Sequence, residues 1–178
     1  MLASSRIILK KLTFEDIELY HRWRNDMEVM NSTNPFLDIY SLDETRQFVE
    51  GVMLGSEASK SYIMVDKQED TPFGIISLIH IDYKNRNAEC IIDIGDKTYW
   101  GRGYGKEALT VLLDYAFLEM NLHRISLRVF SFNDRAIHLY RKMGFQQEGI
   151  SRQSLFRGGK WHDIIQMGIL QNEYIQQH

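Results

Sequence analysis

The chain has 178 residues, a length that suits one hydrophobic core, so we expect a single domain over residues 1–178. Hydrophobic residues make up 44% of the sequence and charged residues 25%, which excludes an intrinsically disordered chain. A formal net charge of -3 at pH 7 provides no overall basic field, so the composition argues against nucleic acid as a partner.

The amino-terminal third of the sequence predicts one strand followed by two helices. Residues 6–12 are expected to form the strand. Thr13, with Asp16 three residues later, is a typical helix start, and Ser41 with Glu44 has the capping-box pattern of a second start. Apolar residues follow on one face of the second helix, namely Leu42, Phe48, Val49 and Val52.

The middle of the sequence predicts three strands and then a long helix. Residues 61–65, 73–81 and 88–94 have strand composition, and the turn signals between them favour an antiparallel meander. From Gly105 the pattern changes to an apolar stripe at helical spacing. The stripe consists of Leu109, Leu112, Leu113, Ala116, Phe117 and Met120.

The last part of the sequence predicts a strand, a short helix and a hairpin. Residues 124–130 predict the strand, and the helix after it is expected to end at Gly144, because glycine suits the left-handed residue that closes a helix. Residues 145–156 and 161–170 flank Arg157-Gly158-Gly159-Lys160, which is a strong hairpin signal.

Cysteine content and hydropathy bear on the cellular compartment. Cys90 is the only cysteine, which excludes an internal disulfide and a clustered-cysteine zinc site, and we expect no bound metal. The amino terminus lacks the apolar stretch of a secretory signal, and no apolar run approaches the roughly 20 residues of a membrane span. We therefore expect a soluble, cytoplasmic protein without a membrane partner.

The glycine-rich sequence at residues 100–105, Trp-Gly-Arg-Gly-Tyr-Gly, lies between a predicted strand and the long helix. Backbone N–H groups at such a junction can converge on a phosphate, and the helix amino terminus adds partial positive charge. A Walker A loop would require glycine at position 100 and Ser or Thr at 107, where the chain has Trp100 and Glu107. A Rossmann fingerprint would require its third glycine at Lys106. From spacing alone, a turn that only reverses the chain remains open.

Two motifs carry a family resemblance. The glycine-rich sequence resembles the acyl-CoA pyrophosphate loop of the GNAT superfamily, Gln/Arg-x-x-Gly-x-Gly/Ala, although Trp100 departs from its first position. Residues 133–136 and 140–145 resemble the second cofactor motif of that family, Asn-x-x-Ala followed by Tyr-x-x-x-Gly-Phe. The resemblance implies a GNAT acyl-CoA N-acyltransferase fold of the α/β (α+β) class. Its sheet is expected to be mixed but largely antiparallel, flanked by helices, with a carboxy-terminal hairpin.

Further segments resemble particular branches of this family. Residues 23–26 and 156–161 look like ribosomal-protein amino-terminal acetyltransferases, and residues 86–145 look like spermidine acetyltransferases. Both branches use acetyl-CoA as co-substrate. The resemblance therefore implies an N-acetyltransferase that moves an acetyl group from acetyl-CoA to a primary amine.

The resemblance also implies the coenzyme contacts. Asn133 is expected to contact the pantetheine arm, and Tyr140, two helical turns further on, is expected to reach the thioester sulfur as general acid. The alternative for Tyr140 is a core tyrosine with a hydrogen-bonded hydroxyl. The full set of expected coenzyme contacts is Ile92, Ile94, Arg102, Gly103, Tyr104, Gly105, Lys106, Asn133, Arg135 and Tyr140.

An acceptor ammonium must lose a proton before its nitrogen can attack, so a base or a water relay is required. Glu89 and Asp93 alternate with apolar residues on one strand and therefore point to one face. Glu89 is the first choice for the base, with Asp93, a water relay or a merely solvated carboxylate as alternatives. Trp23, Glu89 and Asp93 are the expected substrate contacts. Cys90 lies among apolar strand residues, which favours an inert thiol and direct transfer.

The acceptor is less well defined than the reaction. A protein or peptide amino terminus is the first choice, and the alternatives are a polyamine such as spermidine or spermine and an amino sugar. A noncatalytic acyl-CoA-binding regulatory module is the alternative of another class. The exposed face of the carboxy-terminal hairpin is expected to pair two copies of the chain into a homodimer.

Overall fold

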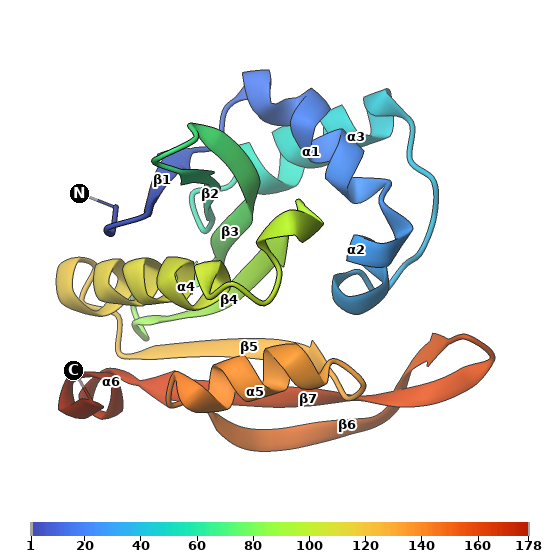
Figure 1. Cartoon of the computed structure of the whole chain (residues 1–178). Coiled ribbons are helices and arrows are strands. Elements are labelled where there is room, and N and C mark those ends of the chain that lie inside the picture. The colour runs from blue at the N-terminus through green and yellow to red at the C-terminus, as the bar shows by residue number, and fades with distance from the viewer. Residues whose placement is uncertain (1, 178) are drawn as a thin grey trace.

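A computed structural model describes residues 2–177 of the chain, and a mixed sheet of seven strands crosses this part (Figure 1). The strand order is β1-β2-β3-β4-β5-β7-β6. The strands are β1 (Ile7–Lys11), β2 (Lys60–Asp66), β3 (Thr71–Asp82), β4 (Asn87–Ile94), β5 (Arg124–Phe130), β6 (Gln146–Arg157) and β7 (Lys160–Leu170). All neighbouring strands are antiparallel except β4 and β5, which are parallel. The predicted mixed but largely antiparallel sheet with a carboxy-terminal hairpin is confirmed.

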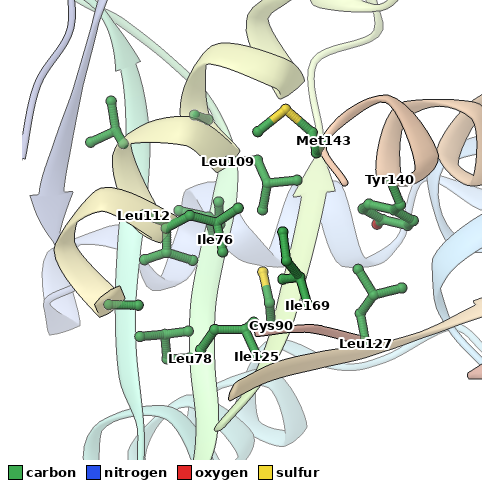
Figure 2. Close-up of a cluster of buried hydrophobic side chains, with 14 of the residues drawn as sticks. Ile76, Leu78, Cys90, Leu109, Leu112, Ile125, Leu127, Tyr140, Met143 and Ile169 are labelled. Carbon is green, nitrogen blue, oxygen red and sulfur yellow. The ribbon is translucent and has the colours of Figure 1, made fainter. Parts of the chain in front are cut away.

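Helices cover the sheet and enclose two apolar clusters within the described chain. The helices are α1 (Ile17–Arg24), α2 (Met27–Thr33), α3 (Leu42–Phe48), α4 (Tyr104–Asp114), α5 (Asp134–Lys142) and α6 (Gln171–Gln177). One cluster joins α1 to β2 and β3, and the larger one joins α4 and α5 to the centre of the sheet. Figure 2 shows the larger cluster, where Leu109 and Leu112 of α4 and Tyr140 and Met143 of α5 meet strand residues.

Local signals in the sequence explain several of these boundaries. The Ser41 hydroxyl accepts a hydrogen bond from the Glu44 amide, and the Glu44 carboxylate accepts one from the Ser41 amide, so the predicted capping box begins α3. Gly144 closes α5 with a φ of 92°. The expected hairpin joins β6 to β7.

The prediction of two helices before the sheet is wrong, because α2 makes a third. α2 has seven residues, which is about two helical turns and too short for a clear apolar period. Asp26 begins it by accepting hydrogen bonds from the amides of Glu28 and Val29. The short helix α6 was not predicted either. The long helix begins at Tyr104 as expected, and from Tyr115 to Glu119 it continues as a π-helical turn.

The parallel pair β4 and β5 separates along its length. Residues 87–89 of β4 pair with residues 124–126 of β5, and in the described chain their register goes no further. β3 continues to pair with β4 as far as Ile94, and β7 pairs with β5 as far as Phe130. The carboxyl-terminal halves of β4 and β5 therefore diverge while each keeps its outer neighbour.

None of the helices between residues 2 and 177 is both long and apolar enough to cross a membrane.

Candidate active site

A cleft of about 560 Å³ lies where β4 and β5 diverge. Its walls come from α2, β4, the glycine loop (residues 100–105), β5 and α5. The structure brings ten of the sequence-predicted site residues to this lining, namely Glu89, Ile92, Asp93, Ile94, Gly103, Gly105, Lys106, Asn133, Arg135 and Tyr140. The cleft is therefore the candidate active site.

The glycine loop approaches the cleft through its backbone. Gly101 and Gly103 have φ values of 71° and 82°, a left-handed conformation that glycine adopts without strain. A Cβ atom at Gly105 would lie 3.1 Å from the Ile94 side chain, so the close approach of α4 to β4 also favours glycine there. Gly103 caps the amino terminus of the eleven-residue helix α4, a position where backbone amides and the helix dipole bind anions.

Trp100 takes part in the loop although it departs from the family motif. Its indole Nε1 donates a hydrogen bond to the carbonyl oxygen of Ile94, at 2.9 Å. The Arg135 guanidinium lies 4.1 Å from the centre of the indole ring, and both residues line the cleft. A cation supplied by α5 therefore lies beside the loop position where the family usually has Gln or Arg.

Two expected coenzyme contacts lie outside the cleft lining. The Arg102 guanidinium lies over the rings of Tyr99 and Tyr104, at 5.6 and 5.5 Å from their centres. The Tyr104 hydroxyl donates a hydrogen bond to Asp66 at 2.7 Å and is buried. Both side chains are therefore engaged by neighbouring protein groups and do not line the cleft.

Tyr140 projects from α5 toward the strands (Figure 2) and lines the cleft with only 8% of its surface exposed. Burial raises the pKa of its phenol far above the usual value, with further contributions from Cys90 and Asp93. The hydroxyl therefore stays protonated and can donate a hydrogen bond into the cleft.

Asn133 begins α5 and connects it to α2. Its side-chain oxygen accepts a hydrogen bond from the Ala136 amide at 3.2 Å, which caps the helix. Its side-chain nitrogen donates to the carbonyl oxygen of Ser32 at 3.3 Å. The residue expected to contact pantetheine therefore also holds the wall that α2 contributes.

Asp93 and Glu89 both line the cleft, but their surroundings differ. Burial raises the pKa of Asp93 to about 6, and a hydrogen bond with Thr33 only partly offsets this effect. Glu89 accepts a hydrogen bond from the Arg128 guanidinium at 2.8 Å, and its other oxygen lies 3.3 Å from His80 Nδ1. Glu89 is therefore already paired with a cation, whereas Asp93 contacts a neutral hydroxyl.

Three further predictions concern Cys90, Trp23 and a bound metal. Burial raises the pKa of the Cys90 thiol to about 12, which suppresses the thiolate that a nucleophile requires. Trp23 lies outside the cleft lining, in the cluster around α1. Its ring covers Gly95, where a Cβ atom would come within 2.2 Å of it. Between residues 2 and 177, no three His, Cys, Asp or Glu side chains are grouped to hold a metal ion.

Several cleft residues had no signal in the sequence. Ser32, Thr33 and Pro35 come from α2 and the residues after it, and Phe130 and Ile164 come from the facing strands. Their positions depend on how α2 packs against β4 and β5, which no local pattern reveals.

Comparisons with known proteins agree with this geometry. The acetyltransferase (GNAT) domain family matches residues 6–146. The N-acetyltransferase p20 of Bacillus licheniformis, described as uncharacterized, is 31% identical over 175 residues, which are 97% of each chain. Spermidine N(1)-acetyltransferase of Vibrio cholerae serotype O1 is 30% identical over 172 residues, again 97% of each chain.

Solved structures give the same result. The crystal structure of spermidine N-acetyltransferase from Vibrio cholerae in complex with CoA and spermine has a TM-score of 0.87 and 31% identity, over 97% of this chain and 99% of that one. A dodecameric structure of the Vibrio cholerae spermidine N-acetyltransferase has a TM-score of 0.82 and 30% identity, over 98% of this chain and 99% of that one.

Proposed function

The chain belongs to the GNAT acetyltransferase family and is an acetyl-CoA-dependent N-acetyltransferase, and from this premise we propose that its acceptor is a polyamine such as spermidine or spermine. The main support is the likeness to spermidine N(1)-acetyltransferase over 97% of both chains. The comparisons favour this alternative over the peptide amino terminus that the sequence put first.

Two carboxylates in the cleft lining also support a cationic acceptor. Glu89 and Asp93 lie four residues apart on β4, which corresponds to about 13 Å along a strand. A linear molecule with several ammonium groups can approach both carboxylates at once. A peptide presents one amino-terminal charge and would use only one of them.

For the donor, we propose that the glycine loop binds the diphosphate of acetyl-CoA and that Tyr140 lies at the sulfur end. The support is the amino terminus of α4 at the loop, together with Lys106 and Arg135 in the cleft lining. β4 and β5 diverge beyond their paired residues, and Ile92 and Ile94 of β4 line the space between the two strands. The pantetheine arm would lie in this space.

Transfer would then be direct. The acceptor nitrogen bonds to the acetyl carbonyl carbon, the carbon–sulfur bond breaks, and the sulfur leaves as a thiol once it has gained a proton. The nitrogen releases one of its two protons, which restores the group that protonated the sulfur. We assign that proton to the Tyr140 hydroxyl, which is kept protonated by burial. The raised pKa of Cys90 argues against an acyl-cysteine intermediate.

The acceptor ammonium must first lose a proton, and two carboxylates compete for that role. Glu89 was the first choice from sequence, but its carboxylate is already paired with the Arg128 guanidinium. Asp93 has a pKa near 6, is partly buried and contacts the neutral Thr33 hydroxyl. We therefore assign Asp93 to bind the ammonium and accept its proton, directly or through a water molecule, with Glu89 binding a second ammonium.

An acceptor panel tests the proposed substrate class. The purified full chain is incubated with acetyl-CoA and, in turn, spermidine, spermine, short peptides and an amino sugar, and CoA release is followed together with the mass of the product. We expect a higher kcat/KM for spermidine or spermine than for any peptide or amino sugar. A peptide that is acetylated more efficiently than both polyamines would contradict the proposal.

We also propose that copies of the chain associate through the β6–β7 hairpin. The rings of Phe156 and Trp161 lie 5.1 Å apart on this hairpin and are 57% and 59% exposed. The related Vibrio enzyme has a dodecameric structure. Light scattering should show a smaller particle for Phe156→Ser/Trp161→Ser than for wild type, whereas Phe14→Ser, at an exposed site elsewhere, should leave the particle size unchanged. A monomeric wild type would contradict the proposal.

A further inference from the structure

The segment before β1 contacts the glycine loop through Arg6. The Arg6 Nη1 atom donates a hydrogen bond to the carbonyl oxygen of Arg102, at 3.3 Å. The Arg6 guanidinium lies 4.4 Å from the centre of the Tyr104 ring, and a Cβ atom at Gly103 would lie 3.5 Å from its Nη2. Arg6 therefore contacts three consecutive residues of the loop without lining the cleft itself.

Glu107, in the first turn of α4, holds Arg6 in this position. Its Oε2 accepts a hydrogen bond from Arg6 Nε at 2.6 Å and lies 2.6 Å from Nη2. Its Oε1 accepts from the Arg6 amide at 3.0 Å and from the hydroxyls of Ser4 and Ser5. Burial acts to raise the pKa of Glu107, but the hydrogen bonds from Ser4 and Arg6 outweigh it and lower that pKa.

This pairing changes what Arg6 can contribute. Its charge is matched by Glu107, so its net attraction for a phosphate is small. The other hydrogen bond of the Arg6 side chain, to the Arg102 carbonyl, acts on the geometry of the loop instead.

The orientation of one peptide group follows from that bond. Peptide bonds in the described chain are trans, so the C=O and N–H of each peptide point in opposite directions. When Arg6 holds the carbonyl of Arg102, the N–H of Gly103 in the same peptide group points away from Arg6. Gly103 is also the loop residue that lines the cleft and caps α4.

We propose that Arg6 is a positioning residue that aims the Gly103 N–H at the diphosphate of acetyl-CoA by holding the Arg102 carbonyl through a hydrogen bond. The proposal rests on the diphosphate binding at the glycine loop, as proposed above. Tyr104 gives the loop a second anchor through its bond to Asp66, so losing Arg6 disturbs the amide without unfolding the loop.

Two acetyl donors, acetyl-CoA and S-acetylpantetheine, distinguish a positioning role of Arg6 from a general loss of active structure. S-acetylpantetheine keeps the thioester and the pantetheine arm of acetyl-CoA but lacks the diphosphate. In Arg6→Met, the KM for acetyl-CoA should rise about tenfold, the size expected for one charge-assisted hydrogen bond. The kcat/KM for S-acetylpantetheine and the KM for the amine should stay at their wild-type values.

Further variants control for stability. Arg6→Lys can keep its ion pair with Glu107 but lacks the second donor of the guanidinium fork. It should therefore keep the wild-type Tm and still show the raised KM for acetyl-CoA. Lys10→Met, at an exposed position of β1, the strand that follows Arg6, should behave as wild type with both acetyl donors.

The outcomes distinguish a failure of the role assigned to Arg6 from a failure of the proposed diphosphate site. If Arg6→Met lowers kcat/KM for both donors equally, or if Arg6→Lys keeps the wild-type KM for acetyl-CoA, Arg6 does not position the loop and this inference is wrong. If wild type uses S-acetylpantetheine as efficiently as acetyl-CoA, the diphosphate is not bound at the glycine loop, and the donor site proposed above is wrong as well.

Discussion

Tyr140 is a buried phenol at the end of a cleft, and its surroundings decide what it can do. Burial keeps the hydroxyl protonated over the whole range of physiological pH. Its ring packs in the core, with the Phe145 ring 5.9 Å away, so the direction of the hydroxyl is restricted. This combination suits a fixed proton donor.

Tyr140→Phe should therefore lower kcat by about 10² to 10⁴, the usual contribution of a general acid, with little change in the KM for acetyl-CoA. Steady-state kinetics measure both values. Tyr174→Phe is the matched control, because Tyr174 is a buried tyrosine whose hydroxyl bonds to Asp114, outside the cleft lining. An unchanged kcat in Tyr140→Phe would reject the assignment.

Asp93 should dominate the acid limb of the pH–rate profile. A base with a pKa near 6 is protonated and inactive below that pH, so kcat/KM for the amine should rise as the pH increases through about 6. Asp93→Asn should lose this limb and fall by about 10²-fold or more in kcat/KM. Glu89→Gln should keep the limb, and the reverse pattern would return the role of base to Glu89.

The same carboxylate should lower stability at neutral pH. Its pKa rises from 3.8 to about 6 on folding, so between these values the folded state binds more protons than the unfolded state. The free energy of unfolding therefore falls as the pH rises through this window and stays lower above it. Because Asp93 is partly exposed, we expect Asp93→Asn to be about 1–2 kcal/mol more stable than wild type at pH 7.

Urea denaturation at several pH values measures this difference. The gain should shrink toward zero at about pH 3 and below, where both states of the wild type are largely protonated at Asp93. A variant that is less stable than wild type at pH 7 would show that the Asp93 carboxylate contributes favourable contacts instead.

Among the elements, α2 depends most on its neighbours. A helix of seven residues is not stable alone, and its last carbonyl groups need partners. Arg157 of the hairpin donates to the carbonyl oxygen of Asn31, and to that of Asn34 at 2.7 Å. Asn133 donates to Ser32. The hairpin and α5 together therefore hold the wall that carries Thr33, the partner of Asp93.

Arg157→Ala should loosen this wall and raise the KM for the amine. The loss leaves carbonyl groups of α2 without their partner, which costs about 1–3 kcal/mol, so we expect an increase of about five- to 100-fold. The KM for acetyl-CoA should stay unchanged, because the glycine loop is elsewhere. Arg152→Ala, at an exposed position on β6, is the control for the removal of an arginine. Equal effects of the two variants on both KM values would contradict the role of Arg157 in holding α2.

At the scale of the whole molecule, the sheet has two parts that meet at a short seam. β1 to β4 form one part and β5, β7 and β6 form the other, and among residues 2–177 only 87–89 and 124–126 pair across the seam. Figure 1 shows α4 and α5 beside the strands on either side of this seam. A ligand in the cleft contacts both parts.

Acetyl-CoA or CoA should therefore raise the Tm of the whole chain. A ligand at 100 times its Kd stabilises the folded state by about 2.7 kcal/mol, which for a chain of this size corresponds to about 5–10 °C. Calorimetry with increasing CoA measures the shift. No rise in Tm at saturating CoA would mean that the coenzyme does not bind the folded state at this cleft.

The sequence by itself determined the reaction and most of the elements. The glycine loop, the Asn133 and Tyr140 spacing, the Ser41 capping box and the hairpin glycines all act within a few residues, so a local pattern was enough to predict them. The largely antiparallel sheet was also predicted, and eight of the ten coenzyme contacts implied by the family resemblance line the cleft.

Only the tertiary structure decided the contacts across the cleft. It showed that Asp93 contacts Thr33 whereas Glu89 is paired with Arg128. It also showed that Trp23 lies in the apolar cluster around α1 and that Thr33, on the unpredicted helix α2, lines the cleft. It also brought Arg6 to a carbonyl group 96 residues away. These properties depend on burial and on charges from distant segments, and no spacing along the chain encodes which side chains will meet when the sheet and its helices pack.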